Sequence, residues 1–254
     1  MRALLASLAC AVLLAGCGHG GGLAAERRGD LVYETGGEGP GRVTVIRPAD
    51  AAGPLPLVLF LHGWGATEAR FYRPWLEHLA HEGNAVIYPR YQDSFAEPPP
   101  QVLGNVLVGV REALEELDDA DLDSLVVAGH SAGGALAADY AAIARGVGLP
   151  EARGVLSMYP GRSFRGVRFS IPAVDPGRIP ADTVLLVLSG ADDRVVDPRD
   201  ARAIHDGADR VRRKRYEVIA TPGADDHLGP QRATRVSRET FWARLDALIA
   251  KART

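Results

Sequence analysis

The feature that most constrains the fold is a regular alternation of short apolar runs and longer amphipathic runs, beginning at residue 31. The run LPLVLFLHG (55–63) is almost wholly apolar, which is typical of a strand buried on both faces of a sheet. The amphipathic run TEARFYRPWLEHLAHEG (67–83) follows it, and NAVIYPRY (84–91) again has the pattern of a strand. Strands that alternate with helices predict an α/β fold with a mostly parallel central sheet and helices on both faces.

The two ends of this region set its limits. LVYETG (31–36) and RVTVIRP (42–48) are separated by glycine-rich residues and predict an opening antiparallel pair of strands. The segment between Pro160 and Asp182 holds three prolines and no long helical pattern, so little or no cap domain is expected over the sheet. A chain of 254 residues suits one large domain, which we assign to residues 31–254.

The N-terminus has the pattern of an export signal. Arg2 precedes the apolar run LLASLACAVLLA (4–15), which is too short to span a bilayer as a mature helix. The run ends in LAGC, which resembles the lipobox of bacterial lipoproteins, and this resemblance implies that residues 1–16 are removed and Cys17 is lipidated. A plain secretory signal with an incidental cysteine is the alternative. Glycine-rich and then charged residues (17–30) predict a flexible tether.

The expected protein is therefore exported and held by lipid at the cell membrane or the outer membrane of a bacterium. The other cysteine of the chain, Cys10, lies in the signal, so the mature domain has no disulfide and depends on its hydrophobic core.

Charge and composition exclude several other functions. The net charge of −3 provides no bulk attraction for nucleic acid, and we interpret the basic run RVRRKRYE (210–217) as a solvated helix end that leads into an edge strand. DADLDS (119–124) begins like a calcium loop but lacks the required glycine and glutamate, so we interpret it as a polar connection. The sequence contains no zinc spacing and no phosphate loop, and no metal or cofactor is expected.

One serine stands at a position where a nucleophile would be expected. In VVAGHSAGG (126–134), Ser131 lies between glycines, after a predicted strand and before a predicted helix. A sharp turn there would force the serine into a strained conformation, and tiny neighbours such as Gly129 and Gly133 would permit it. The alternative is an ordinary tight connection.

A nucleophilic serine needs a base, and the base needs an orienting acid. Of the seven histidines, His227 is the best candidate, because it follows the last predicted strand in the loop TPGADDHLGP (221–230). That loop should emerge at the same sheet edge as the serine. The run LLVLSGADDRVVDP (185–198) offers three candidate acids, Asp192, Asp193 and Asp197.

The carboxylates stand in a setting similar to that of the α/β-hydrolase family. Asp193 is framed by Gly190 and Val196 in the family's G-x-x-D-x-x-V pattern, which favours it over Asp192. The resemblance covers nearly all of residues 31–254 and implies an α/β-hydrolase fold in which Ser131, Asp193 and His227 form a catalytic triad.

The same resemblance implies an oxyanion hole. FLHGWGA (60–66) ends a strand in His-Gly-x-Gly, and in this family a similar turn donates the backbone N–H of the residue after His-Gly, here Trp64. The second donor would be the N–H of Ala132, directly after the serine. The motif departs from the His-Gly-Gly-Gly of lipases, and a plain glycine turn is the alternative.

These expectations together predict a monomeric serine hydrolase that cleaves small-molecule or lipid-like carboxylic esters through an acyl-enzyme. A thioesterase or a peptidase would use the same residues, and a non-catalytic binding lipoprotein is a further alternative. The short segment after residue 160 predicts an open cleft, with Tyr91, Phe95 and Tyr159 near its mouth.

Overall fold

The structure is a computed structural model that describes residues 23–164 and 170–253. The signal peptide, Cys17 and the first part of the expected tether lie outside these residues. In the part of the chain that is described, none of the helices has both the length and the apolar character needed to cross a bilayer.

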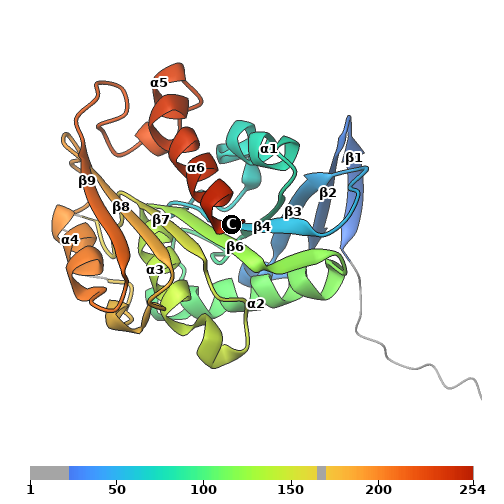
Figure 1. Cartoon of the computed structure of the whole chain (residues 1–254), viewed down its shortest axis with the longest axis horizontal. Coiled ribbons are helices and arrows are strands. Elements are labelled where there is room, and N and C mark those ends of the chain that lie inside the picture. The colour runs from blue at the N-terminus through green and yellow to red at the C-terminus, as the bar shows by residue number, and fades with distance from the viewer. Residues whose placement is uncertain (1–22, 165–169, 254) are drawn as a thin grey trace, which may run out of the picture.

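A nine-stranded sheet forms the centre of the molecule, in the order β1-β2-β3-β5-β4-β6-β7-β8-β9 (Figure 1). The strands are β1 (Ala24–Arg28), β2 (Leu31–Gly36), β3 (Val43–Pro48), β4 (Leu55–Leu61), β5 (Ala85–Pro89), β6 (Ala120–His130), β7 (Gly154–Met158), β8 (Val184–Gly190) and β9 (Arg213–Ile219). The first three strands and β5 pair antiparallel, whereas β5, β4, β6, β7, β8 and β9 pair parallel. The sheet is therefore mostly parallel, with an antiparallel edge at the N-terminal end.

Helices cover both faces of this sheet. They are α1 (Arg73–His81), α2 (Val102–Glu116), α3 (Ala132–Ile143), α4 (Pro198–Gly207), α5 (Arg235–Ser237) and α6 (Ala243–Ala252), and a π-helical turn (Arg238–Trp242) precedes α6. One buried cluster joins α2, α3 and α4 to one face, and a second joins α1 and α6 to the other. This two-sided burial explains why β4 is apolar at both alternating positions.

The helix nearest the centre is built from small residues. In α3, eleven of the twelve residues are buried, and six of the twelve are alanines. Small side chains allow the helix axis to lie close to the sheet, where α3 contacts β4, β6 and β7. This position fixes the N-terminus of α3 at the end of β6, directly after Ser131.

Three sequence-based boundaries differ from the structure. Residues 24–28, expected to belong to the tether, pair with β2 as the exposed strand β1. The polar run 119–124, expected as a connection, forms the start of β6 from Ala120 onward. The helix expected from residue 67 begins only at Arg73, after a 3₁₀ turn over Ala69–Phe71. The first two segments lack apolar alternation and become strands through backbone pairing with a neighbouring strand.

Between β7 and β8, the described residues form one short 3₁₀ helix, Pro176–Arg178.

Candidate active site

Ser131 occupies a sharp turn between β6 and α3. Its backbone has φ 58° and ψ −120°, a conformation that costs energy for any residue with a Cβ. A Cβ on Gly129 would lie 2.0 Å from the carbonyl oxygen of Gly133, and one on Gly133 would lie 2.1 Å from the carbonyl oxygen of Leu61. Only glycine fits at these two positions, so the flanking glycines are required by the turn itself.

His227 lies beside this serine, in the loop that follows β9. Its Nε2 is 3.0 Å from Oγ of Ser131, and its Nδ1 is 2.7 Å from Oδ2 of Asp193. The serine hydroxyl can donate to Nε2 while the Nδ1–H group donates to the carboxylate. The structure thus brings together three residues that the sequence separates by 34 and 96 positions.

The three candidate acids have different partners. Asp193 contacts His227 with one oxygen and accepts the N–H groups of Val195 and Val196 with the other, at 2.9 and 3.2 Å. Asp192 is exposed and pairs with Arg194, and Asp197 accepts the N–H of Arg199 at the start of α4. Only Asp193 reaches the histidine.

The environment of Asp193 favours its ionised form. Burial raises the pKa of this carboxyl, but the hydrogen bond and charge of His227 and the two backbone N–H groups lower it more, so the pKa lies below its usual value. A carboxylate at this position can hold the imidazole with Nδ1 protonated and Nε2 open toward the serine.

The two expected oxyanion donors lie close to the serine. Ala132 is the first residue of α3, where backbone N–H groups have no acceptor within the helix and the helix dipole favours negative charge. Trp64 lies in the turn after β4, and both residues line a narrow recess together with Ser131. The N–H groups on either side of Trp64 are held, that of Gly63 by the Tyr72 hydroxyl and that of Gly65 by Oε1 of Gln92, each at 3.0 Å.

A second set of hydrogen bonds supports the site, and sequence reasoning missed it. The Tyr72 hydroxyl accepts the N–H of Gly63 and donates to Nδ1 of His130 at 2.7 Å. Nε2 of His130 donates to the carbonyl oxygen of His227 at 2.8 Å. Tyr72 and His130 therefore join the turn after β4, the serine turn and the histidine loop. The only sequence signal was an aromatic residue on a predicted helix.

His130 is neutral in this network. Its ring is buried, and this burial, together with the charge of His227, lowers the pKa of His130 to about 3. The neutral ring suits its two partners, because Nδ1 accepts from a hydroxyl while Nε2–H donates to a carbonyl.

A cavity of about 350 Å³ opens in front of Ser131 and His227. Its other lining residues include Trp64, Phe95 and Leu228. Phe95 is 62% exposed and lies at the mouth, as expected.

The expectation for Tyr91 and Tyr159 is wrong, because both side chains are fully buried. Their hydroxyls donate to the carbonyl oxygens of His62 and Ala224, so they hold the loops of the site and do not face the cleft. Over the described residues, no group of three or more His, Cys, Asp or Glu side chains is arranged to hold a metal ion.

Comparison with known proteins identifies the fold. A family model described as the alpha/beta hydrolase fold matches residues 58–192, a span that begins in β4 and includes Ser131. No curated protein matches the chain significantly.

Solved structures match over most of the chain. Esterase B from Lactobacillus rhamnosis, inhibited by a tributyrin phosphonate, has a TM-score of 0.67 and 18% identity, covering 89% of this chain and 87% of that one. A dienelactone hydrolase from Klebsiella pneumoniae has a TM-score of 0.61 and 20% identity, with 85% and 93% covered. An esterase from Pyrobaculum calidifontis has a TM-score of 0.64 and 20% identity, with 89% and 87% covered. The expected fold is confirmed.

Proposed function

Because the chain belongs to the α/β-hydrolase family, we propose that this hydrolase cleaves carboxylic esters through a Ser131–His227–Asp193 triad and an acyl-enzyme. The observation that carries the proposal is the position of His227, whose two ring nitrogens contact Ser131 and Asp193 at 3.0 and 2.7 Å. A histidine with a carboxylate on one nitrogen and a hydroxyl on the other is equipped to take the hydroxyl proton.

In the first half of the reaction, Oγ of Ser131 attacks the ester carbonyl while Nε2 of His227 takes its proton. Asp193 keeps the proton on Nδ1 and stabilises the imidazolium that forms. The N–H groups of Trp64 and Ala132 receive the negative charge that develops on the carbonyl oxygen. His227 then gives its proton to the leaving alcohol, and the acyl group stays on Ser131. Water then attacks the acyl-enzyme while His227 takes its proton, and the carboxylic acid is released as that proton returns to Ser131.

The direction of proton transfer fixes where the two parts of the ester lie. The leaving oxygen must be near Nε2 of His227, so the alcohol occupies the cavity of about 350 Å³ that His227, Leu228 and Phe95 line. The acyl group then lies in the narrow recess that Ala132, Gly161 and other residues line. This arrangement favours esters with a short acyl group and a larger apolar alcohol.

Two of the structural neighbours are named as esterases, which is consistent with an ester substrate. The Lactobacillus rhamnosis enzyme is called an esterase and was captured with a tributyrin phosphonate, an analogue of a short-chain ester. For this chain, the proposal of ester hydrolysis is based on the contacts of His227, and the matching fold is consistent with it.

We also propose that residues 1–16 are a signal peptide and that lipid on Cys17 holds the enzyme at a bacterial membrane. The support is the sequence alone, in which LAGC closes the apolar run. The domain would then work as a monomer at a membrane surface, where lipid-like esters are concentrated.

The decisive experiment combines labelling with turnover. A fluorophosphonate should label the wild-type protein, and Ser131→Ala should abolish labelling and lower kcat by about 10⁴ to 10⁶ with the fold intact. p-Nitrophenyl esters of rising acyl length, with matched thioester and anilide substrates, should show that short esters react fastest. A Ser131→Ala protein that still turns over would refute the mechanism. Faster hydrolysis of the thioester or the anilide would replace the esterase with a thioesterase or a peptidase.

A further inference from the structure

A polar cavity of about 400 Å³ lies beside α1, on the face of the sheet that this helix covers only in part. Side chains of β1, β2, β3 and β5 line it, among them Thr35 and Thr44, which pair across β2 and β3. The segment 67–73, which leads into α1, closes one side. This cavity shares no lining residue with the one in front of Ser131.

Five arginines line the cavity, and two of them have carboxylate partners. Arg28 forms an ion pair with Glu26 at 2.7 Å. Arg90 forms an ion pair with Asp93 at 3.3 Å. The charges of these two guanidinium groups are therefore largely neutralised.

The other three arginines of the lining give the cavity its charge. Arg42, Arg70 and Arg73 are exposed and form no ion pair with any residue that the structure describes. Glu68 is the one carboxylate of the lining outside the ion pairs, and Glu77, one turn after Arg73 on α1, lies outside the lining. The cavity thus keeps an excess of positive charge, although the whole chain has a net charge of −3.

Strand register places this cavity at the same edge of the sheet as the serine turn. Ala24 pairs with Thr35, Thr35 with Thr44, and Thr44 with Tyr88, so the start of β1 is level with the carboxyl end of β5. Because β5, β4 and β6 are parallel, their carboxyl ends share one edge, and Ser131 directly follows β6. The chain before Ala24 consequently joins the domain at the edge that carries the candidate active site.

Exposed apolar side chains stand at this edge as well. Phe71 is 39% exposed beside the cavity, and Cζ of Arg70 lies 5.2 Å from the centre of its ring. Phe95, in the loop after β5, is 62% exposed, and Leu228, in the loop after β9, is 50% exposed. Arginines mixed with projecting apolar side chains are typical of surfaces that lie on a bilayer, where the cations meet anionic headgroups and the apolar groups enter the interface.

We propose that this edge of the domain docks on a bilayer that contains anionic phospholipids. Arg42, Arg70 and Arg73 contact the phosphate groups, Phe71 enters the interface, and the opening in front of Ser131 faces the lipid. Charge complementarity and the entry of the chain at Ala24 favour this partner, and a small soluble anion would leave the exposed apolar side chains without a role. The orientation depends on the proposed anchor, which brings the domain to a membrane, and not on ester hydrolysis.

The experiment measures sedimentation of the full-length Cys17→Ser protein with vesicles, so that covalent lipid does not contribute. Vesicles of equimolar phosphatidylglycerol and phosphatidylcholine should bind the protein at least about tenfold more tightly than phosphatidylcholine alone, because only the former attract the arginines. The apolar run 4–15 contributes to both, so the ratio reports the charge. Raising the ionic strength from about 0.05 to about 0.5 M should remove most of the difference.

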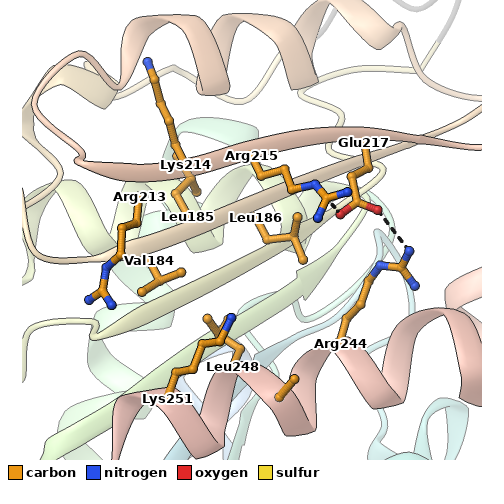
Figure 2. A pocket seen from close by; sticks show the side chains of 11 residues that line it. Val184, Leu185, Leu186, Arg213, Lys214, Arg215, Glu217, Arg244, Leu248 and Lys251 are labelled. Carbon is orange, nitrogen blue, oxygen red and sulfur yellow. Dashed lines mark hydrogen bonds and ion pairs between the residues drawn. The ribbon is translucent and has the colours of Figure 1, made fainter. Parts of the chain in front are cut away.

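Variants in the same background locate the contact. Arg42→Glu combined with Arg70→Glu should weaken binding to the anionic vesicles by about tenfold or more, whereas Lys at both positions should retain binding within about threefold. Arg210→Glu combined with Arg213→Glu is the matched control, because it changes the net charge equally at the opposite edge of the sheet. Arg213 begins β9 and lines the cavity between β8, β9 and α6 (Figure 2). This control should lose less than about threefold.

Three results would overturn the proposal. The first is equal binding to the two kinds of vesicle. The second is an equal loss in the two Arg→Glu double variants, which would mean that net charge and not this edge determines binding. The third is saturable binding of glycerol 1-phosphate that displaces the vesicles, which would make the cavity a site for a small phosphate ester. Hydrolysis of a soluble p-nitrophenyl ester, measured on the same proteins, should be unchanged in the variants, so the proposed activity is tested separately.

Discussion

The hydroxyl of Tyr72 lies 2.7 Å from Nδ1 of His130, and both residues are buried. The same hydroxyl accepts the N–H of Gly63, and His130 donates to the backbone carbonyl of His227. One hydrogen-bonded chain therefore holds the turn that precedes Trp64 and the loop that carries His227. The hydrogen bonds of Tyr72 and His130 go to Gly63, to each other and to the carbonyl of His227, so in the proposed reaction both would act by positioning.

Removing the hydroxyl of Tyr72 should lower catalytic activity more than it lowers the stability of the fold. Tyr72→Phe leaves the N–H of Gly63 and Nδ1 of His130 without their partner. Each unsatisfied buried group of this kind costs about 1 to 3 kcal/mol of folding free energy. We expect kcat to fall by about tenfold to a hundredfold with little change in KM, because the oxyanion turn and the histidine loop both loosen.

Tyr33→Phe is the matched control for that prediction. Its hydroxyl donates to Glu77, away from the site, so the variant loses one hydrogen bond without touching the network. Steady-state kinetics and thermal unfolding of the two variants provide the comparison. If both lose the same small amount of activity, Tyr72 has only a structural role.

The two adjacent aspartates should behave very differently. Asp193→Asn replaces the carboxylate that holds His227 and should lower kcat by about 10⁴, because an amide can stabilise the wrong tautomer. Asp192→Asn removes an exposed partner of Arg194 and should change kcat by less than about twofold. Hydrolysis of a p-nitrophenyl ester measures both. The opposite order would transfer the acid role to Asp192.

Acid should destabilise the fold through His130 well before the carboxylates titrate. The pKa of His130 is about 3 in the folded protein, against about 6.5 for an unperturbed histidine. Between these values the unfolded chain binds a proton that the folded protein does not, so stability is full above about pH 6.5 and falls as the pH decreases toward 3. Over this pH range, His130 should lower the free energy of unfolding by about 1.4 kcal/mol for each unit by which the pH decreases.

Urea unfolding at pH 7.5 and at pH 5.5 measures this effect. His130→Asn should have a smaller difference between the two pH values than wild type, although it is less stable at both. His81→Asn, a change at an exposed histidine that pairs with Asp30, should keep the wild-type difference. An unchanged pH dependence in His130→Asn would mean that His130 is not held neutral by the fold.

The anchor can be tested independently of the site. Cys17→Ser removes the only cysteine after the predicted cleavage point, so the protein should lose its lipid and move from the detergent phase to the aqueous phase on partitioning. Ester hydrolysis by the solubilised variant should be unchanged. Equal partitioning of wild type and variant would leave a plain secretory signal in place of the lipoprotein.

Much of the candidate site could be predicted from the sequence, because its members follow strand ends in chain order. Ser131, Asp193 and His227 follow the ends of β6, β8 and β9 by 1, 3 and 8 residues, and parallel strands bring these ends to one edge of the sheet. The choice between Asp192 and Asp193 depended on a resemblance. In the structure the choice follows from where the Asp193 carboxylate points. The backbone N–H groups of Val195 and Val196 bind one of its oxygens, and the other oxygen contacts His227.

The supporting residues could not be predicted, because their roles come from contacts distant in sequence. Tyr72 meets His130 across 58 positions, and nothing in a helical pattern marks which aromatic side chain will do so. Tyr91 and Tyr159 have positive φ values of 36° and 49°, and the sequence indicates no glycine-like turn at either residue. Both were consequently expected at the mouth of the cleft, whereas their rings are buried beneath it.

The edge strand β1 has a consequence for how the enzyme could work at a membrane. Pairing of Ala24–Arg28 with β2 removes about half of the expected tether. A chain anchored at Cys17 would have seven residue steps before Ala24, a reach of at most about 25 Å. A domain of this size has a radius of gyration of about 17 Å. A sphere with this radius of gyration is about 44 Å across, so the tether would be shorter than the domain is wide. Hydrolysis would then be confined to a thin layer next to the bilayer, and substrates farther out would not be reached.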